Sequence, residues 1–254
     1  MERSRTRWFC AKAAVCLLVL ASGARAADAN PAPASFDLRE RADAPGVVIF
    51  AARGTGPFPM TVVLHGMCGD AARTCRHFAD AVTENAHLIC PRATARCAGG
   101  GASFPEQGVE DAVESAVTRA KSLLGEVDES HGRTLIGYSL GAFRALRIAQ
   151  SAAGKYPRVM LIGAKIMPDQ QKLEQSGVER LLLGAGNWDM MHDHMQREAA
   201  RFYRAGFATR FLDLGPMGHA LTSNFDESLP RALSWLRGAE PTAAEAEAPR
   251  AQPR

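Results

Sequence analysis

Residues 133–143 read Arg-Thr-Leu-Ile-Gly-Tyr-Ser-Leu-Gly-Ala-Phe, and this stretch constrains the fold of the chain more than any other. An apolar run of β-forming residues leads into the pattern G-x-S-x-G, and a helix-forming segment follows at once. Gly137 and Gly141 lack a Cβ, so a strand and a helix can approach closely at a sharp turn. The turn raises Ser139 above the sheet at a helix N-terminus, where free N–H groups and the helix dipole favour negative charge.

The rest of the chain alternates between two kinds of hydrophobic pattern. Short continuous apolar runs, typical of buried parallel strands, are separated by segments with the three- and four-residue spacing of helices. This order predicts the α/β class, with a mostly parallel twisted sheet, helices on both faces and chemistry at the carboxyl ends of the strands. The predicted strands are an edge pair within 39–51, then 61–64, 87–90, the run before Ser139, 159–162, 181–183 and 209–214; the predicted helices are 70–84, 105–124, the segment after Ser139, 190–205 and 227–236.

No separate cap domain is expected. Only about 17 residues, 163–179, lie between two of the predicted strands, which is too few for one. The domain is expected to span residues 36–237. A flexible leader rich in Ala and Pro precedes it at 27–35, and a tail without periodicity, expected to be disordered, follows at 238–254.

Residues 1–26 have the three-part pattern of a signal peptide. Basic residues open the segment, an apolar core follows at 13–21, and Ala24-Arg25-Ala26 forms a small-x-small cleavage site. The apolar core is too short to be a stable bilayer anchor. We therefore expect a secreted or periplasmic protein; the alternative is a cytosolic chain with an apolar N-terminus.

Removal of this segment changes the charge balance of the chain. It carries five of the 30 Lys and Arg residues and one of the 27 Asp and Glu residues, which leaves 25 basic against 26 acidic residues. A nearly neutral chain without a basic patch has no feature that attracts nucleic acid or a membrane surface. We expect neither a nucleic-acid partner nor a stable membrane anchor, and the sequence sets no oligomeric state.

Four cysteines follow residue 26, namely Cys68, Cys75, Cys90 and Cys97. An even number in an exported chain indicates two disulfides, for which three connectivities exist. The equal spacing of seven residues favours two local loops, Cys68–Cys75 and Cys90–Cys97, and a cross-strand pairing of Cys68 with Cys90 stays open. A zinc site is the rival interpretation, but no C-x-x-C pair supports it.

A serine nucleophile requires a base to take its proton and an acid to orient that base. His219 follows the last predicted strand on a glycine-flanked loop, and Asp189 follows the strand before it. Both residues should therefore lie at the same sheet edge as Ser139. Asp193 and Asp213 are alternative acids, while an N-cap role for the serine and an idle loop position for the histidine are the structural alternatives.

The chain order Ser139, Asp189, His219 resembles that of the α/β-hydrolase superfamily. The resemblance covers roughly residues 47–236. It is nearest to the small, lidless serine esterases, such as the dienelactone-hydrolase and phospholipase/carboxylesterase groups. It implies an α/β-hydrolase fold without a separate cap domain.

By the same resemblance, the His65-Gly66 turn after an earlier strand looks like an oxyanion loop. The backbone N–H groups of Met67 and Leu140 would then hold the negatively charged oxygen of a reaction intermediate. His65 itself is expected to shape its loop by hydrogen bonding. The Met67-Cys68 insertion and the Cys-bounded loops depart from the family pattern, so the substrates of the family do not carry over.

The run Met-Met-His-Asp-His-Met at 190–195 raises the idea of a copper or zinc site. On a helix, Met191 and Met195 share one face, while His192 and His194 point apart. That arrangement favours core methionines with two solvated histidines over a metal centre. We predict no metal and no other cofactor.

Taken together, these patterns predict an exported serine hydrolase that cleaves carboxylic esters through a Ser-His-Asp triad and an acyl-enzyme. Without a lid, its site should be open and should take soluble short-chain esters or bulky exposed ones. Trp188, beside the predicted acid, is either a wall of the substrate pocket or a core residue. Alternatives are thioester or peptide cleavage or acyl transfer by the same triad and, in a different class, a catalytically silent binding protein of this fold.

Overall fold

The computed structural model describes residues 41–44, 46–222, 225 and 228–239. The predicted signal peptide at 1–26, the leader at 27–35 and nearly all of the predicted tail at 238–254 lie outside these residues. Those assignments, and with them the expected domain limits of 36 and 237, stay predictions.

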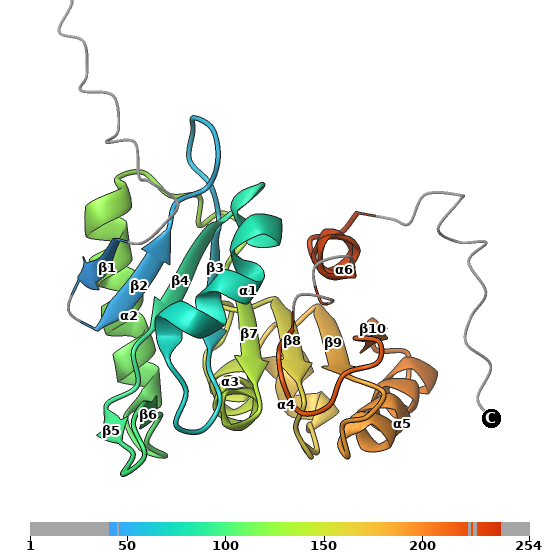
Figure 1. The fold of residues 1–254 in the computed structure, drawn as a ribbon. Helices are drawn as coiled ribbons and strands as arrows, with labels where there is room; N and C mark the ends of the chain where they lie inside the picture. The colour runs from blue at the N-terminus through green and yellow to red at the C-terminus, as the bar shows by residue number, and fades with distance from the viewer. Residues whose placement is uncertain (1–40, 45, 223–224, 226–227, 240–254) are drawn as a thin grey trace, which may run out of the picture. The chain divides into compact units, whose positions relative to one another are not determined.

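Within the described residues, an eight-stranded sheet has the strand order β1-β2-β4-β3-β7-β8-β9-β10 (Figure 1). Neighbouring strands from β4 to β10 are parallel, whereas β2 is antiparallel to both β1 and β4. The carboxyl ends of β3, β7, β8, β9 and β10 therefore share one edge of the sheet. The strands are β1 (Arg41–Ala44), β2 (Val47–Phe50), β3 (Met60–Leu64), β4 (His87–Pro91), β7 (Thr134–Tyr138), β8 (Arg158–Ile162), β9 (Arg180–Ala185) and β10 (Thr209–Asp213).

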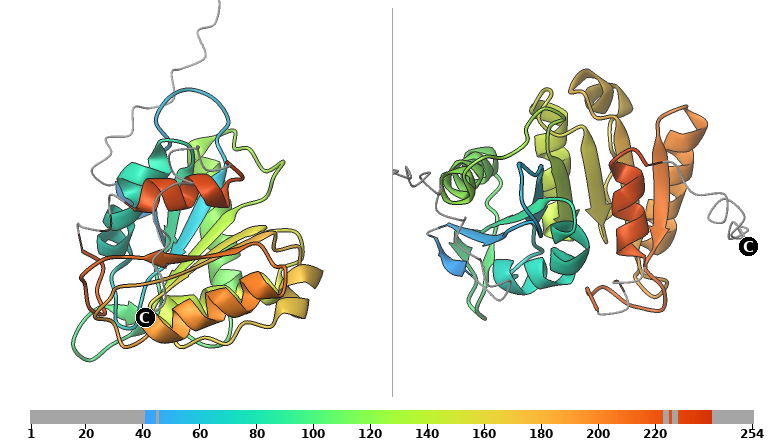
Figure 2. Two further views of the ribbon diagram at one scale, coloured as in Figure 1. Left: turned by 90° about the vertical axis from the view of Figure 1, so that its right-hand side faces the viewer. Right: turned by 90° about the horizontal axis from the view of Figure 1, so that it is seen from above.

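Helices cover both faces of this sheet (Figures 1 and 2). Helices α1 and α6 pack into the core on one face, and α2, α3, α4 and α5 pack into the core on the other. Successive residues of β7 alternate between the two cores, with Leu135 in one and Ile136 in the other. Burial on both faces is why the strands are continuous apolar runs. The helices are α1 (Ala71–Thr83), α2 (Val109–Leu124), α3 (Leu140–Ser151), α4 (Gln170–Gln175), α5 (His192–Arg204) and α6 (Leu229–Leu236).

The predicted start of one helix needs correction. The helix expected from residue 105 begins at Val109, because Gly108 has φ +74, a left-handed conformation that cannot continue a helix. After β4 the chain forms a small hairpin, in which β5 (Ala95–Arg96) pairs antiparallel with β6 (Ala102–Ser103). Between β8 and β9 the chain forms only the short helix α4 and its flanking turns, so no cap domain interrupts it there.

The disulfide pairing favoured by the sequence spacing is wrong. The bonds join Cys68 to Cys97 and Cys75 to Cys90, with Cα–Cα distances of 5.7 and 6.2 Å. Cys75 lies on the face of α1 that packs on the sheet and meets Cys90 near the end of β4, and both are buried in one core. Cys68 lies in the exposed loop before α1 and meets Cys97 in the hairpin loop. Equal spacing along the chain carries no information about which side of a helix faces a strand.

Candidate active site

Ser139 lies at the turn between β7 and α3 with φ +54 and ψ −119, an uncommon conformation for a residue other than glycine. Two close approaches hold it there. A Cβ on Gly141 would lie 2.2 Å from the carbonyl oxygen of Leu64 on β3, and one on Gly137 would lie 2.4 Å from the carbonyl oxygen of Gly141. Side chains at either glycine would push α3 away from the sheet, so the G-x-S-x-G pattern is what permits this turn.

The structure brings Ser139, His219 and Asp189 into one hydrogen-bonded chain. The serine Oγ lies 2.9 Å from the histidine Nε2, and the histidine Nδ1 lies 2.8 Å from the aspartate Oδ2. With the proton on Nδ1, the hydroxyl donates to Nε2 and Nδ1–H donates to the carboxylate. The carboxylate side chain is only 3 % exposed, and its Oδ1 accepts the backbone N–H of Met191 at 2.9 Å. Both carboxylate oxygens therefore have a hydrogen-bond partner, and Oδ2 is directed at the imidazole.

The other two aspartates considered as the acid lie elsewhere. Asp193 is 79 % exposed and contacts His192 rather than His219. Asp213 ends β10 and accepts the backbone N–H of Gly215 at 2.8 Å. Of the three, only Asp189 contacts the imidazole of His219.

The loops that carry the acid and the base are joined to each other. The backbone N–H groups of Asn187 and Trp188 donate to the carbonyl oxygens of Gly215 and Met217 at 2.9 and 3.1 Å. Gly186 permits this approach, since a Cβ there would lie 2.1 Å from the Met217 oxygen. The ends of β9 and β10 thus present the aspartate and the histidine as one unit.

Sequence reasoning missed two residues that pack on this pair. The ring of Tyr138 stacks on the imidazole of His219 with centroids 5.4 Å apart. Burial, and secondarily the charge of Asp189, raises the pKa of Tyr138 to about 12, so its phenol stays neutral. Gly163, at the end of β8, has φ +61, and a Cβ there would lie 3.1 Å from Asp189 Oδ2. In the sequence, the only sign that Gly163 belongs to the site is its position directly after a predicted strand.

The loop after β3 lies beside the serine. A Cβ on Gly66 would be 3.2 Å from the Cβ of Ser139. His65 is buried, and its Nδ1–H donates to the carbonyl oxygen of Gly66 at 2.9 Å. Burial lowers the pKa of His65, so the imidazole is neutral and shapes its loop as predicted.

The two amides expected to face an oxyanion flank this region. Met67 follows Gly66, and its N–H makes no hydrogen bond to any residue the structure describes. Leu140 is the first residue of α3 and has no carbonyl of its own helix to which its N–H could donate. The side chain of Met67 is 68 % exposed, so the residue contributes backbone rather than packing.

A cavity of about 330 Å³ opens beside His219, where Trp188, Met190 and Met191 complete its lining. Trp188 is therefore a cavity wall and, at 74 % exposure, not a core residue. A larger hollow of about 570 Å³ lies along the polar, solvent-facing side of α2. We place the candidate substrate site at the smaller cavity, because it adjoins the hydrogen-bonded chain.

The Met/His segment shows no metal-binding arrangement. Met195 is buried in the core, His194 Nε2 lies 2.6 Å from the carbonyl oxygen of Ile166, and His192 packs edge-on against Phe211. The two histidines are partly buried rather than solvated as expected. Across the described residues, no group of three or more His, Cys, Asp or Glu side chains is placed to hold a metal ion.

The sheet order and the strand–serine–helix turn are those of the α/β-hydrolase fold, and comparison with known proteins confirms this fold class. No family model and no curated protein matches the sequence.

Three solved structures show the likeness. FphF, a fluorophosphonate-binding serine hydrolase of Staphylococcus aureus, is 15% identical over 76% of this chain and 92% of its own, with a TM-score of 0.57. Esterase PE8 is 16% identical over 74% of this chain and 96% of its own, with a TM-score of 0.56. Acyl-protein thioesterase 2 of Zea mays is 20% identical over 76% and 99%, with a TM-score of 0.53. The neighbours are serine hydrolases and esterases, and at these identities they establish the fold alone.

Replacing Gly163 by alanine should disturb the Asp–His pair. The new Cβ would lie 3.1 Å from Asp189 Oδ2 and 3.3 Å from His219 Cε1, closer than most real contacts of this kind. We expect Gly163→Ala to lower kcat/KM by about tenfold or more, because small displacements of reacting groups have large effects on rate. The measurement is kcat/KM on an activated ester.

Gly154→Ala is the matched control for this variant. Gly154 also has a left-handed φ, +71, but no atom lies within 4 Å of a Cβ built there. Both variants should lose a similar free energy of unfolding, about 1 kcal/mol, from backbone strain. Equal activity of the two variants would contradict the contact between Gly163 and the Asp–His pair.

Proposed function

We propose that this protein is a serine hydrolase that cleaves carboxylic esters through an acyl-enzyme. The observation that carries the proposal is the continuous hydrogen-bonded chain from Ser139 Oγ through His219 to Asp189, with distances of 2.9 and 2.8 Å. This chain supplies a nucleophile, a base in contact with it and an acid that orients the base.

In the acylation step, Ser139 Oγ attacks the ester carbonyl while His219 Nε2 takes its proton. The carbonyl oxygen becomes an oxyanion that the N–H groups of Met67 and Leu140 face, each such donor contributing about 3–4 kcal/mol to lowering the barrier in related enzymes. The imidazolium then gives its proton to the leaving alcohol oxygen as the C–O bond breaks. Asp189 fixes the Nδ1–H tautomer and stabilises the positive charge of the ring.

In the deacylation step, water takes the place of the alcohol. His219 removes a proton from this water as its oxygen attacks the acyl carbon, and the same two N–H groups face the second oxyanion. Collapse releases the carboxylic acid, and the imidazole returns the proton to Ser139. The histidine side chain is 45 % exposed, so water reaches it without movement of a lid.

We also propose that the protein is exported. The two disulfides support this, since such bonds persist in oxidising compartments and are rare in a reducing cytosol. None of the helices in the described ranges combines the length and hydrophobicity that a membrane span requires. Mass spectrometry of the N-terminus of the mature protein tests the cleavage expected before Ala27.

The catalytic roles predict the behaviour of three variants. Ser139→Ala should abolish hydrolysis of nitrophenyl esters above background. Asp189→Asn should lower kcat by up to about 10⁴-fold, because the amide favours the wrong imidazole tautomer. Asp193→Asn is the control, since this exposed carboxylate does not contact His219 and its loss should leave kcat unchanged.

Steady-state kinetics on purified, folded variants is the measurement. Hydrolysis retained by Ser139→Ala, or an equal loss in the two aspartate variants, would overturn the assignment of nucleophile and acid. Parallel assays with a thioester, a peptide and an alcohol acceptor compare ester cleavage with the other reactions open to the same residues.

A further inference from the structure

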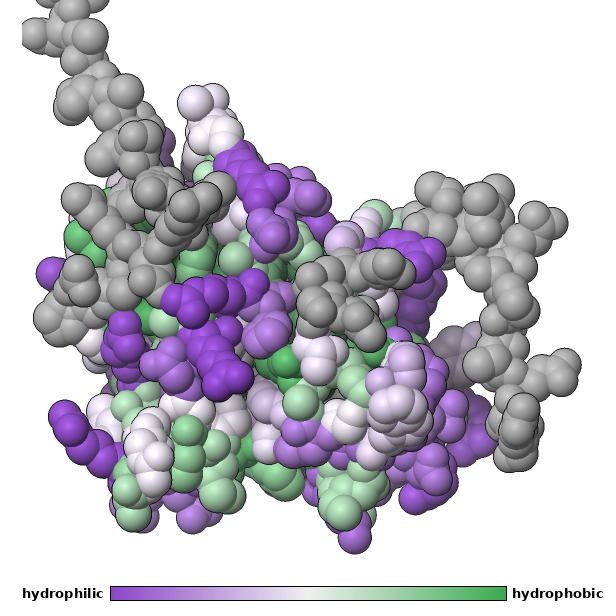
Figure 3. Space-filling model, in the orientation of Figure 1, coloured by the Kyte–Doolittle hydropathy of each residue, from purple (hydrophilic) through white to green (hydrophobic). Residues whose placement is uncertain are grey.

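The cavity beside His219 is lined by soft apolar side chains. Trp188, Met190 and Met191 form it together with the imidazole, and the first two are 74 % and 86 % exposed. In Figure 3 apolar side chains lie among polar ones on the lower part of this face, the side toward which β7, β8 and β9 point in Figure 1. Large apolar side chains left open to water at the edge of a reactive site indicate a surface that substrate covers.

We propose that this cavity binds the alcohol part of the ester, and that this alcohol bears an uncharged ring or branched apolar group. The inference rests on the proposed function. His219 must give its proton to the leaving oxygen, so the group attached to that oxygen continues past the imidazole that bounds the cavity.

Sheet order places the proposed oxyanion site and the cavity on opposite sides of the serine. Met67 follows β3, which lies on one side of β7 and its serine, whereas Trp188 and Met190 follow β9 on the other side. The carbonyl oxygen is directed toward the amides of Met67 and Leu140. The β9 side, beyond the histidine, is thus left for the leaving group.

The size and chemistry of the cavity narrow the class of alcohol. Its volume of about 330 Å³ is at the lower end of the range for small-molecule sites, roughly 300–1,000 Å³, and a dry cavity of about 150 Å³ holds benzene. An aromatic ring therefore fits and can stack on the indole or contact the thioethers. A cationic alcohol is disfavoured, because the imidazole becomes positively charged during the reaction.

Three substrates with matched leaving-group chemistry test the proposal. Ethyl acetate is the reference, benzyl acetate enlarges the alcohol, and ethyl phenylacetate enlarges the acyl group. The wild type should prefer benzyl acetate to ethyl acetate by kcat/KM. Trp188→Ala should reduce that preference by about tenfold, as expected for loss of an apolar contact, and Met190→Ala should reduce it less.

Tyr203→Ala is the control, an exposed aromatic at the far end of α5 that does not line the cavity. It should leave two ratios of kcat/KM unchanged, that of benzyl acetate to ethyl acetate and that of ethyl phenylacetate to ethyl acetate. The inference is overturned if the Trp188 and Met190 variants change kcat/KM for ethyl phenylacetate relative to ethyl acetate instead, or if neither ratio changes. A wild type that hydrolyses no ester at all overturns the proposed function itself, which is a different result.

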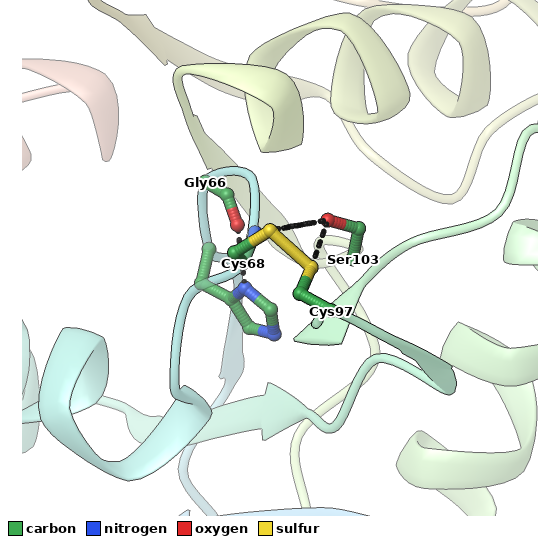
Figure 4. Close-up of a disulfide and its surroundings, with 5 residues drawn as sticks. Gly66, Cys68, Cys97 and Ser103 are labelled. Atoms are coloured by element: carbon green, nitrogen blue, oxygen red, sulfur yellow. Dashed lines mark hydrogen bonds between the residues drawn. A yellow bond between two sulfur atoms is a disulfide. The ribbon is translucent and has the colours of Figure 1, made fainter. Parts of the chain in front are cut away.

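A second, independent observation concerns the exposed disulfide. Cys68 follows Met67, and its sulfur is bonded to that of Cys97 in the hairpin loop (Figure 4). Ser103 Oγ accepts the N–H of Cys68 at 2.9 Å, and the N–H of Ala102 donates to the carbonyl oxygen of Gly69 at 3.1 Å. Gly101 is packed so closely that a Cβ there would lie 2.2 Å from the Cys68 carbonyl oxygen.

These contacts hold Cys68 at φ +50, one of two described residues other than glycine with a positive φ; the other is Ser139. We propose that the Cys68–Cys97 bond positions the Met67 amide toward the oxyanion, acting through the backbone rather than on substrate. This also rests on the proposed function. Residues Cys68 and Cys97 are accordingly positioning residues.

The second disulfide provides a matched comparison. Cys75 and Cys90 are buried between α1 and the sheet, and their bond does not involve the residues next to Met67. The Cys75–Cys90 bond closes a segment of 15 residues and the Cys68–Cys97 bond one of 29. Stabilisation by a disulfide depends only weakly on that length, but Cys75→Ser/Cys90→Ser also places two hydroxyl groups in the core, so its Tm should fall at least as far as that of Cys68→Ser/Cys97→Ser. Only Cys68→Ser/Cys97→Ser should lower kcat, by about tenfold, with KM nearly unchanged. The upper limit is the 10²–10³-fold loss in kcat that follows complete removal of one oxyanion donor.

Kinetics well below the Tm of each double variant, with circular dichroism to verify folding, is the measurement. Ser103→Ala is a second probe of the same loop that leaves both disulfides intact, and it should lower kcat in the same direction. An unchanged kcat in both loop variants, or an equal fall in kcat in the Cys75→Ser/Cys90→Ser variant, overturns the positioning role.

Discussion

The close packing of α3 against β3 and β7 is the constraint on which the site depends. Gly137 and Gly141 leave no room for a side chain between the helix and the sheet, and the backbone at Ser139 takes a left-handed φ as a result. The same approach brings the loop after β3 to within contact of the serine. A strained residue persists only where its surroundings enforce it, and here the two cores and the strands β3 and β7 do so.

The other half of the site is held by backbone contacts between loops. The turns after β9 and β10 are hydrogen-bonded to each other, and the Asp189 carboxylate is held by the Met191 amide below the imidazole. Tyr138 and Gly163 close the remaining sides. The three side chains therefore lie just after β7, β9 and β10, and the parallel sheet brings them together because these strands end at one edge.

Much of this arrangement could be predicted from the sequence. The alternation of apolar runs and helical spacing predicted the sheet, and the positions of Ser139, Asp189 and His219 directly after three of the predicted strands predicted that they meet. The predictions that were wrong depend on how side chains and backbone are oriented in space, which the order of residues along the chain does not show. The disulfide partners follow from which face of α1 meets β4, and the late start of α2 follows from the φ of Gly108. The cavity at Trp188 and the contacts of Gly163 form where loops from distant parts of the chain come together. Local sequence patterns do not predict such contacts.

The proposed function requires that Ser139 be a nucleophile activated by His219. Treatment of the folded protein with a fluorophosphonate, followed by peptide mass spectrometry, tests it most directly. The account predicts one phosphonylated residue, Ser139, with the label lost when the protein is unfolded beforehand or when His219 is replaced by alanine. A folded protein that takes no label, or that takes it at another residue, would contradict the account.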